Sequence, residues 1–97
     1  MPQKEKLKFK DRVYKIVKGI PQGKFLTYKQ VAQLAGSKMA WRAVGNILNK
    51  NRDPKVPCHR VVRSDKKVGG YKNGTKKKMA LLKKEGIIIK KGKVYRS

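Results

Sequence analysis

The chain has 97 residues, which is enough for one domain with a modest core. Lys and Arg total 28 against 5 Asp and Glu, a formal net charge of +23, so we expect a polyanionic partner, of which nucleic acid is the natural example. A single cysteine excludes an intramolecular disulfide and the cysteine-rich zinc sites, and no apolar stretch predicts a signal peptide or membrane span; we expect no metal, no membrane association, and a cytoplasmic or nuclear location.

The first half of the chain predicts three helices. Apolar residues at helical spacing indicate a first helix over about residues 8–18. Thr27 is typical of an N-cap for a second helix over residues 28–35. A tight turn at Gly36–Ser37 follows, with the serine capping a third helix that ends near Asn49. Two short helices joined by such a turn predict a helix-turn-helix, although an ordinary helical hairpin with a solvated polar face would show the same pattern.

The second half of the chain has a different character. We expect loops at residues 51–55 and 69–74, then a helix that Thr75 caps and that ends near Glu85. The buried side of this helix would consist of Met79, Leu81 and Leu82. Residues 87–95 predict a small hairpin. The fold class expected from these elements is mostly α with a small β-hairpin.

Cys58 is the residue expected to do chemistry. A lone cysteine is usually buried and inert, but Cys58 follows a proline at the start of a helical turn, beside His59 and Arg60, in cationic surroundings that lower a thiol pKa. Adjacent side chains do not face each other, so His59 would act as a general base through a water or at a bend in the chain. Among the few acids, Glu85 is our choice to orient His59; the alternative is that Glu85 only pairs with neighbouring lysines.

The sequence around Cys58 resembles a known signature. Pro57-Cys58-His59-Arg60-Val61 is similar to the active-site motif of the O6-alkylguanine-DNA alkyltransferases, the methylated-DNA–protein-cysteine methyltransferases. The resemblance extends over roughly residues 9–89 and implies the family's C-terminal domain, a winged helix-turn-helix-like fold that binds DNA and accepts the alkyl group. The other matching segments are Ile20–Gly23, Thr27-Tyr28, Arg42–Gly45, Asn51, Gly69–Tyr71 and Leu81–Gly86.

The resemblance implies catalytic roles at matching positions. Cys58 would accept the alkyl group, His59 would activate it through a water, and Glu85 would orient His59. Tyr28 would help to rotate the target nucleotide out of the duplex and would assist protonation of the leaving guanine. Asn51 would tie the recognition helix to the active-site segment. The reaction implied is a single transfer, with no cofactor.

The resemblance also implies how DNA is bound. The second helix of the motif would lie in the minor groove, and Arg42 would enter the duplex to fill the gap left by the flipped nucleotide. The residues expected at the DNA are Tyr28, Trp41, Arg42, Ala43, Gly45, Asn46, Lys50 and Arg60. The residues expected to wall the guanine pocket are Pro54, Val68, Tyr71 and Lys72.

The function implied is repair of O6-alkylguanine in double-stranded DNA, with O4-alkylthymine left open as a second substrate. We expect a monomer. The family's N-terminal domain is not among these 97 residues, which leaves open whether a separate repair protein takes its place. Trp41, Asn46 and Lys72 depart from the family's usual residues, so affinity and lesion range are also open.

Two other functions are open at this point. An alkyltransferase-like protein shares the fold, binds O6-alkylguanine without transfer and recruits other repair factors; such proteins usually lack the acceptor cysteine, so Cys58 argues for the enzyme, whereas the short chain argues for the alternative. A nonspecific basic nucleic-acid-binding protein would explain the charge but not the spacing of the motif residues.

Overall fold

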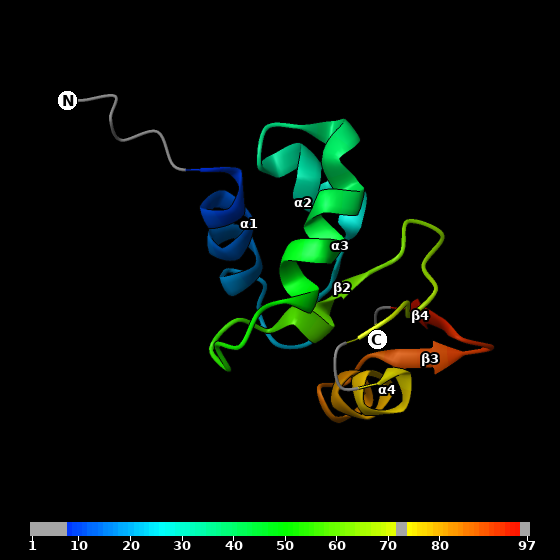
Figure 1. Cartoon of the computed structure of the whole chain (residues 1–97). Helices are drawn as coiled ribbons and strands as arrows, with labels where there is room; N and C mark the ends of the chain where they lie inside the picture. Colours follow the sequence, from blue (N-terminus) through cyan, green and yellow to red (C-terminus); the bar gives the residue numbers. More distant parts are fainter. Residues whose placement is uncertain (1–7, 72–73, 96–97) are drawn as a thin grey trace.

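The computed structural model describes residues 8–71 and 74–95 (Figure 1). Its helices and strands are α1 (Phe9–Lys18), β1 (Leu26–Thr27), α2 (Tyr28–Leu34), the 3₁₀ turn η2 (Lys38–Ala40), α3 (Trp41–Asn49), the 3₁₀ turn η3 (Cys58–Arg60), β2 (Val61–Val62), α4 (Thr75–Lys84), β3 (Ile88–Lys90) and β4 (Lys93–Tyr95). The mostly α architecture with a C-terminal hairpin is confirmed. No described helix is long and apolar enough to cross a membrane.

The first three helices pack around one core. In Figure 1 they form a group on one side of β2, with α4 and the hairpin on the other side. Thr27 is the N-cap of α2, as predicted: its hydroxyl accepts a hydrogen bond from the Gln30 amide at 3.1 Å, and the Gln30 side chain accepts one from the Thr27 amide at 2.8 Å. The buried apolar residues that the three helices contribute are Val13, Val17, Val31, Ala32, Val44 and Leu48.

Three local expectations are corrected. Ser37 makes no capping hydrogen bond, because residues 38–40 form a 3₁₀ turn first and α3 begins only at Trp41. Thr75 is the first residue of α4 rather than its cap; Gly74, at a φ of 96°, holds the cap position. On α4 the fully buried residues are Lys78 and Leu82, whereas Met79 and Leu81 are partly buried.

Two short strand pairs complete the fold. The hairpin pairs β3 with β4 in antiparallel register, Ile89 opposite Val94, as expected. The other pair, β1 with β2, was not predicted: it is parallel, with Leu26 opposite Val61 and Thr27 opposite Val62. A second core lies between this pair, α4 and the hairpin, and consists of Phe25, Val62, Val68, Leu82, Ile87 and Val94.

Strand β2 lies between the two cores. Val61 belongs to the core of the first three helices, and Val62 belongs to the second core. Successive side chains of a strand point to opposite faces, so two adjacent valines can anchor one backbone segment on both sides. Because β2 directly follows η3, this double anchoring fixes the position of Cys58, His59 and Arg60.

Candidate active site

Cys58 is held inside the protein by α3 and the loop that follows it. The residue is 6% exposed and opens the η3 turn, in agreement with the helical turn predicted there. The side-chain amide of Asn51 donates a hydrogen bond to the Cys58 sulfur at 3.2 Å, and the thiol can donate to the Leu48 carbonyl at 3.8 Å. The sulfur is therefore oriented from two directions, as a positioned nucleophile requires.

Asn51 connects the end of α3 to Cys58. Its Nδ2 also donates to the Asp53 carbonyl at 3.0 Å, while its Oδ1 accepts from the Asp53 amide at 3.1 Å. The side chain is buried, so each of these polar groups would be costly to leave without a partner. The structure thus places Asn51 where the family resemblance implied; its part in catalysis remains a prediction.

A cavity of about 370 Å³ reaches Cys58. This volume is within the range of small-ligand sites. Tyr28 and Tyr71 supply two aromatic walls, and α3 supplies a third through Gly45 and Asn46. Leu48, Asn49, Cys58 and Gly70 complete its lining. The helix expected to bind DNA therefore borders the cavity that contains the reactive sulfur, so a base leaving the duplex at α3 would have a short path to Cys58.

Among the described residues that were predicted for the guanine pocket, Tyr71 alone lines this cavity. Val68 does not line it, because its side chain packs into the second core. Pro54 lies on a larger cleft of about 790 Å³, which His59 and Tyr71 also line and Cys58 does not. Tyr71 therefore separates the two hollows. Lys72 lies outside the described residues.

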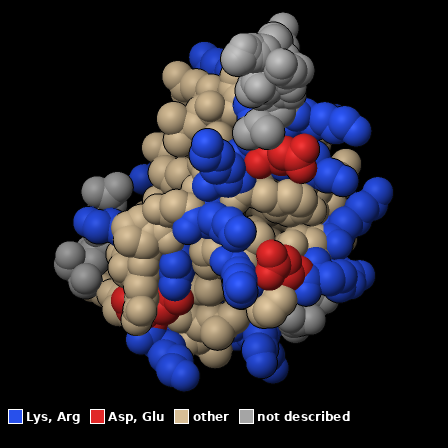
Figure 2. All heavy atoms as spheres, turned by 90° about the vertical axis from the view of Figure 1, so that its left-hand side faces the viewer, with Lys and Arg blue, Asp and Glu red and all other residues tan. Residues whose placement is uncertain are grey.

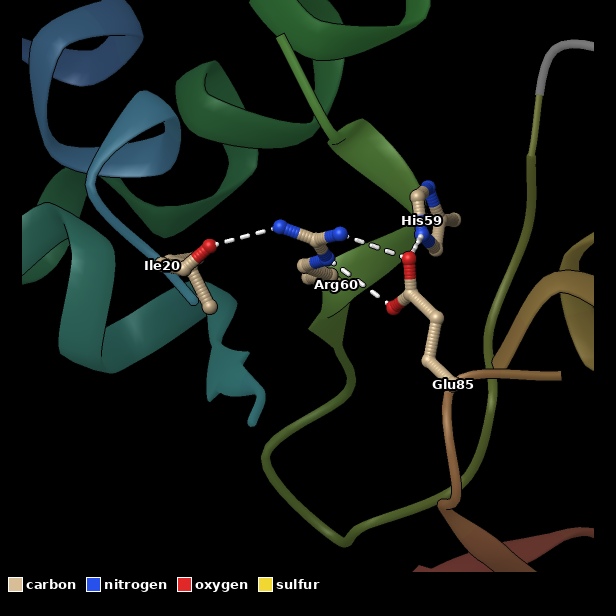
Figure 3. A network of polar contacts seen from close by, with 4 residues as sticks. All are labelled: Ile20, His59, Arg60 and Glu85. Atoms are coloured by element: carbon tan, nitrogen blue, oxygen red, sulfur yellow. Dashed lines mark hydrogen bonds and ion pairs between the residues drawn. The ribbon is translucent and has the colours of Figure 1, made fainter. Parts of the chain in front are cut away.

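His59 and Arg60 both point toward Glu85 (Figure 3). The Nε2 atom of His59 lies 2.9 Å from Oε2 of Glu85, so the pairing expected from the sequence is present. Arg60 donates to both carboxylate oxygens, from Nε at 2.9 Å and from Nη2 at 2.6 Å, and its Nη1 donates to the Ile20 carbonyl at 2.7 Å. This network joins η3, the end of α4 and the segment after α1.

The network favours the ionised form of Glu85. Partial burial raises the pKa of Glu85, but the hydrogen bonds from Arg60 and His59 outweigh it and leave that pKa below its ordinary value. An ionised Glu85 accepts hydrogen bonds only, so the proton of a neutral His59 resides on Nε2. Nδ1 of His59 is then the atom that can take a proton from the thiol.

Arg60, which was predicted to lie at the DNA, makes its described contacts inside the protein. Its guanidinium is mostly buried and is held by Glu85 and Ile20, because η3 turns this side chain toward α4 rather than toward α3. A bidentate arginine–carboxylate pair is a strong and oriented contact. Arg60 therefore supports the active site from within.

Lys78 is a site residue that sequence reasoning missed. It is 0% exposed, its Nζ donates to the Gly70 carbonyl at 3.1 Å, and this ammonium lies 5.6 Å from the centre of the Tyr28 ring. Burial lowers the pKa of Lys78 to about 8, and the negative charge of Cys58 partly counters that effect. The sequence does place Lys78 four residues before Leu82, and residues at this spacing share one face of a helix. Its position in a run of lysines gave no reason to expect it to be buried.

Tyr28 is the first residue of α2 and lines the cavity together with Gly45 and Asn46 of α3. Its ring is partly buried, and this burial, together with the negative charge of Cys58, raises the pKa of the phenol above its ordinary value. The hydroxyl is therefore protonated at neutral pH and can act as a hydrogen-bond or proton donor. This suits the role that the resemblance implies for Tyr28.

The predicted DNA-binding residues of α3 differ in exposure. Arg42, Asn46 and Lys50 are exposed, whereas Trp41, Ala43 and Gly45 are partly buried. The guanidinium of Arg42 lies over the Trp41 ring, 5.1 Å from its centre. Basic charge is not confined to this helix: Figure 2, which views the molecule from the side of α1, shows Lys and Arg spread across that face with few acidic groups between them.

No group of three His, Cys, Asp or Glu side chains gathers among residues 8–71 and 74–95 in a way that could hold a metal ion. The reactive groups described above are an amino-acid thiol, an imidazole, a carboxylate, a phenol and an ammonium. Together they can activate a nucleophile, orient its base and donate a proton to a leaving group. This is the equipment for a nucleophilic displacement by Cys58.

Residues 8–87 match the family described as the DNA-binding domain of 6-O-methylguanine DNA methyltransferase. Over 82 residues the chain is 44% identical to the methylated-DNA–protein-cysteine methyltransferase of Methanothermobacter thermautotrophicus. The aligned region covers 84% of this chain and 46% of that protein. A similar solved structure is OGT of Mycobacterium tuberculosis in complex with DNA, with a TM-score of 0.77, 38% identity, and 84% of this chain and 51% of that chain covered.

A second solved structure is similar along almost its whole length. It is Atl1 of S. pombe in complex with damaged DNA containing O6-carboxymethylguanine, with a TM-score of 0.75, 28% identity, and 99% of this chain and 91% of that chain covered. The chain spans about half the length of the curated relative that it matches. The match over most of its residues shows that this protein belongs to the 6-O-methylguanine DNA methyltransferase family, and that the part it contains is the family's DNA-binding domain.

Proposed function

We propose that the protein repairs O6-alkylguanine in double-stranded DNA by transferring the alkyl group to Cys58 in a single turnover. The observation that carries the proposal is the position of the Cys58 sulfur: it faces a cavity bordered by α3, and Asn51 holds it at 3.2 Å. His59, the next residue in the chain, is paired with Glu85 at 2.9 Å. Similarity to a protein solved in complex with DNA supports the choice of DNA as the partner.

The chemistry follows from the groups present. The Cys58 thiol gives its proton, through a water, to Nδ1 of His59, and the imidazolium formed is stabilised by Glu85. The thiolate attacks the alkyl carbon, a carbon–sulfur bond forms, and the bond from that carbon to guanine O6 breaks with its electron pair left on the guanine. Tyr28 donates a proton to the guanine and is reprotonated from His59 through solvent, so the net proton transfer is from thiol to guanine.

The product explains the single turnover. A thioether on Cys58 has no leaving group that water could displace under mild conditions, so the thiol is not regenerated. No cofactor is needed, because the substrate supplies the alkyl group and the protein supplies the acceptor. We further propose that the protein acts as a monomer, which size-exclusion chromatography with light scattering would test.

The likeness to Atl1 along the whole chain favours a second candidate function, which is lesion binding without transfer. Such a protein would present damaged DNA to other repair factors. The presence of a thiol hydrogen-bonded by Asn51 at the cavity counts against this function, because binding alone requires no nucleophile there.

Mass spectrometry of the intact protein tests the proposal. The chain is incubated with a duplex containing one O6-methylguanine, and Cys58→Ser serves as the control. We expect the mass of one methyl group on the wild-type chain and none on the variant, with DNA binding retained by both. Lesion-selective binding without added mass would establish the second function instead. Binding without lesion preference would exclude both.

A further inference from the structure

A second groove adjoins the active-site cavity. It measures about 480 Å³ and is lined by Tyr28, Trp41, Arg42, Gly45, Asn46 and Arg63. Three of these, Tyr28, Gly45 and Asn46, also line the cavity that reaches Cys58. A DNA strand with one nucleotide in the cavity must continue from its mouth, and this groove is a hollow that begins there.

The parallel strand pair brings Arg63 to this groove. In the register of β1 and β2, Thr27 is opposite Val62. Tyr28 directly follows β1 and Arg63 directly follows β2. Because the strands are parallel, both residues lie at the same end of the pair. Arg63 therefore lies beside a residue of the proposed active site, although neither its place in the chain nor the family motif indicated this.

The backbone holds the side chain of Arg63 in one direction. Gly69, at a φ of 78°, lies under it: a Cβ atom built there would be 3.0 Å from Cγ of Arg63. The guanidinium end remains free to reach a ligand, since the side chain is 57% exposed. Its Nη2 pairs with the exposed carboxylate of Asp65 at 3.2 Å. An exposed pair of this kind contributes little stability, so an incoming anion can replace the carboxylate.

Arg42 supplies a second guanidinium to the lining of the groove. Arg42 lies over Trp41 on α3, and the Trp41 ring is fixed because it packs against the main core. An aromatic surface between two arginines suits a nucleic-acid strand: rings pack on sugars and bases, and guanidinium groups bind phosphate oxygens with two parallel hydrogen bonds. Neutral or cationic ligands would not suit this site.

We propose that Arg63 is a DNA-binding residue, which exchanges Asp65 for a backbone phosphate of the lesion strand next to the nucleotide held in the cavity. The phosphodiester then lies in the groove beside Trp41. This inference rests on the proposed function, since it takes the DNA to be bound with one nucleotide in the cavity.

A scan with neutral phosphates tests this contact. Duplexes with one O6-methylguanine carry a methylphosphonate at one position at a time on the lesion strand, and affinity is measured for the Cys58→Ser protein, so that no transfer occurs. We expect one position beside the lesion to weaken binding about fivefold or more. With Arg63→Gln added, neutralising that phosphate changes the affinity less than twofold, and the slope of log K against log salt decreases by about 1.

Two control variants separate this contact from general charge. Lys90→Gln removes one positive charge at an exposed hairpin residue that does not line the groove, and it should leave the methylphosphonate penalty intact. Asp65→Asn should strengthen binding more than Asp11→Asn on α1, and this gain should vanish when Arg63→Gln is added. Thermal unfolding confirms that each variant is folded.

The inference is overturned if Arg63→Gln keeps the same methylphosphonate penalty, or if it behaves as Lys90→Gln does at every position. Reaction with free O6-benzylguanine distinguishes this failure from failure of the proposed function. We expect Arg63→Gln to react with the free base as the wild type does. If the wild type gains no mass from the free base or from the duplex, the proposed function is wrong, whereas the binding scan still reports on Arg63.

Discussion

Nε2 of His59 and Oε2 of Glu85 lie 2.9 Å apart although 26 positions separate the two residues in the chain. The contact exists because η3 presents His59 on the side of α4, and because Glu85 immediately follows the last residue of that helix. Arg60 holds the same carboxylate from the other side. Glu85 thus orients His59 and also binds Arg60, which joins η3 to the end of α4.

We expect Glu85→Gln to slow alkyl transfer from free O6-benzylguanine by about 100-fold, because the amide cannot stabilise the imidazolium formed on His59. The variant should also lose about 1.5–3 kcal/mol of stability, since Arg60 loses a charged acceptor. Because the folded-state pKa of Glu85 is below its ordinary value, its contribution is present above that ordinary value and is lost as the pH falls. Acid should therefore destabilise the wild type more than Glu85→Gln in urea titrations.

Arg60→Gln is the matched control for that experiment. It removes the bidentate pair but leaves the contact between His59 and Glu85. We expect it to lower the free energy of unfolding while retaining the transfer rate to within about tenfold. A transfer defect as large as that of Glu85→Gln would mean that Glu85 acts through stability alone.

Asn51→Leu should impair both the fold and the thiol. The substitution preserves approximate volume but removes the donor to Cys58 and both contacts with Asp53. Leaving buried polar groups without partners costs about 1–3 kcal/mol, which thermal unfolding would measure. Transfer from O6-benzylguanine should also fall at temperatures where the variant is fully folded. Asp53→Asn, which keeps the backbone contacts with Asn51, should change neither quantity appreciably.

Lys78 gives the stability of the protein an unusual pH dependence. Its pKa is about 8 in the folded protein and ordinary in the unfolded chain, so between these values the unfolded state holds a proton that the folded state has lost. Stability from this residue therefore rises as the pH rises above about 8. Unfolding in urea at pH 7 and pH 9.5 should show this gain for the wild type and not for Lys78→Met. Equal behaviour of the two proteins would contradict the burial of a charged Lys78.

The same variant should be slower although it need not be less stable. The ammonium of Lys78 favours the negative charge that develops on Cys58, and it holds the Gly70 carbonyl at the cavity wall. We expect Lys78→Met to reduce transfer from O6-benzylguanine at least tenfold at pH 7. The wild-type rate should decline toward that of the variant as the pH rises above 8, because the charge is then lost. Lys77→Met, exposed on the same helix, is the control.

Arg42→Ala should separate nucleotide flipping from chemistry. If Arg42 fills the gap in the duplex, its loss leaves an unstacked hole that costs a few kcal/mol. We expect a large decrease in the single-turnover rate on duplex DNA at saturating protein, and little change with free O6-benzylguanine. Lys50→Ala, at the residue that caps the end of the same helix, should lower affinity only and recover the duplex rate at saturation. Equal duplex rates for wild type and Arg42→Ala would leave Arg42 as an ordinary phosphate contact.

The sequence predicted those features that depend on local periodicity or on a compact motif. The three N-terminal helices, the hairpin and the Cys58–His59 segment are of this kind, and the pairing of Glu85 with His59 followed from the family pattern. Arg60, Val68 and Pro54 were assigned by their neighbours in the chain. Their contacts depend on distant segments: Arg60 is bound by Glu85 and Ile20, Val68 packs into the second core, and Pro54 lines the larger cleft.

Two features had no local signal. A strand of two residues is too short to show alternation, so the parallel pair of β1 and β2 could not be read from the chain. The burial of Lys78 depends on its position relative to Leu82 and Gly70. In the sequence, Lys78 cannot be distinguished from the exposed lysines beside it. Both features depend on contacts between distant segments, which periodicity does not report.

The parallel pairing of β1 with β2 affects the stage of folding at which Cys58 becomes able to react. No turn can nucleate it, since parallel strands need a long crossover connection, and closing that loop costs entropy before any contact repays it. We expect β1 and β2 to pair late in folding, after α2 and α3 have packed. During synthesis Cys58 is therefore an unremarkable side chain on an open chain. If the protein reacts only once, as proposed, it acquires its reactivity together with its ability to recognise a target, so fewer molecules are consumed by chance encounters with stray electrophiles.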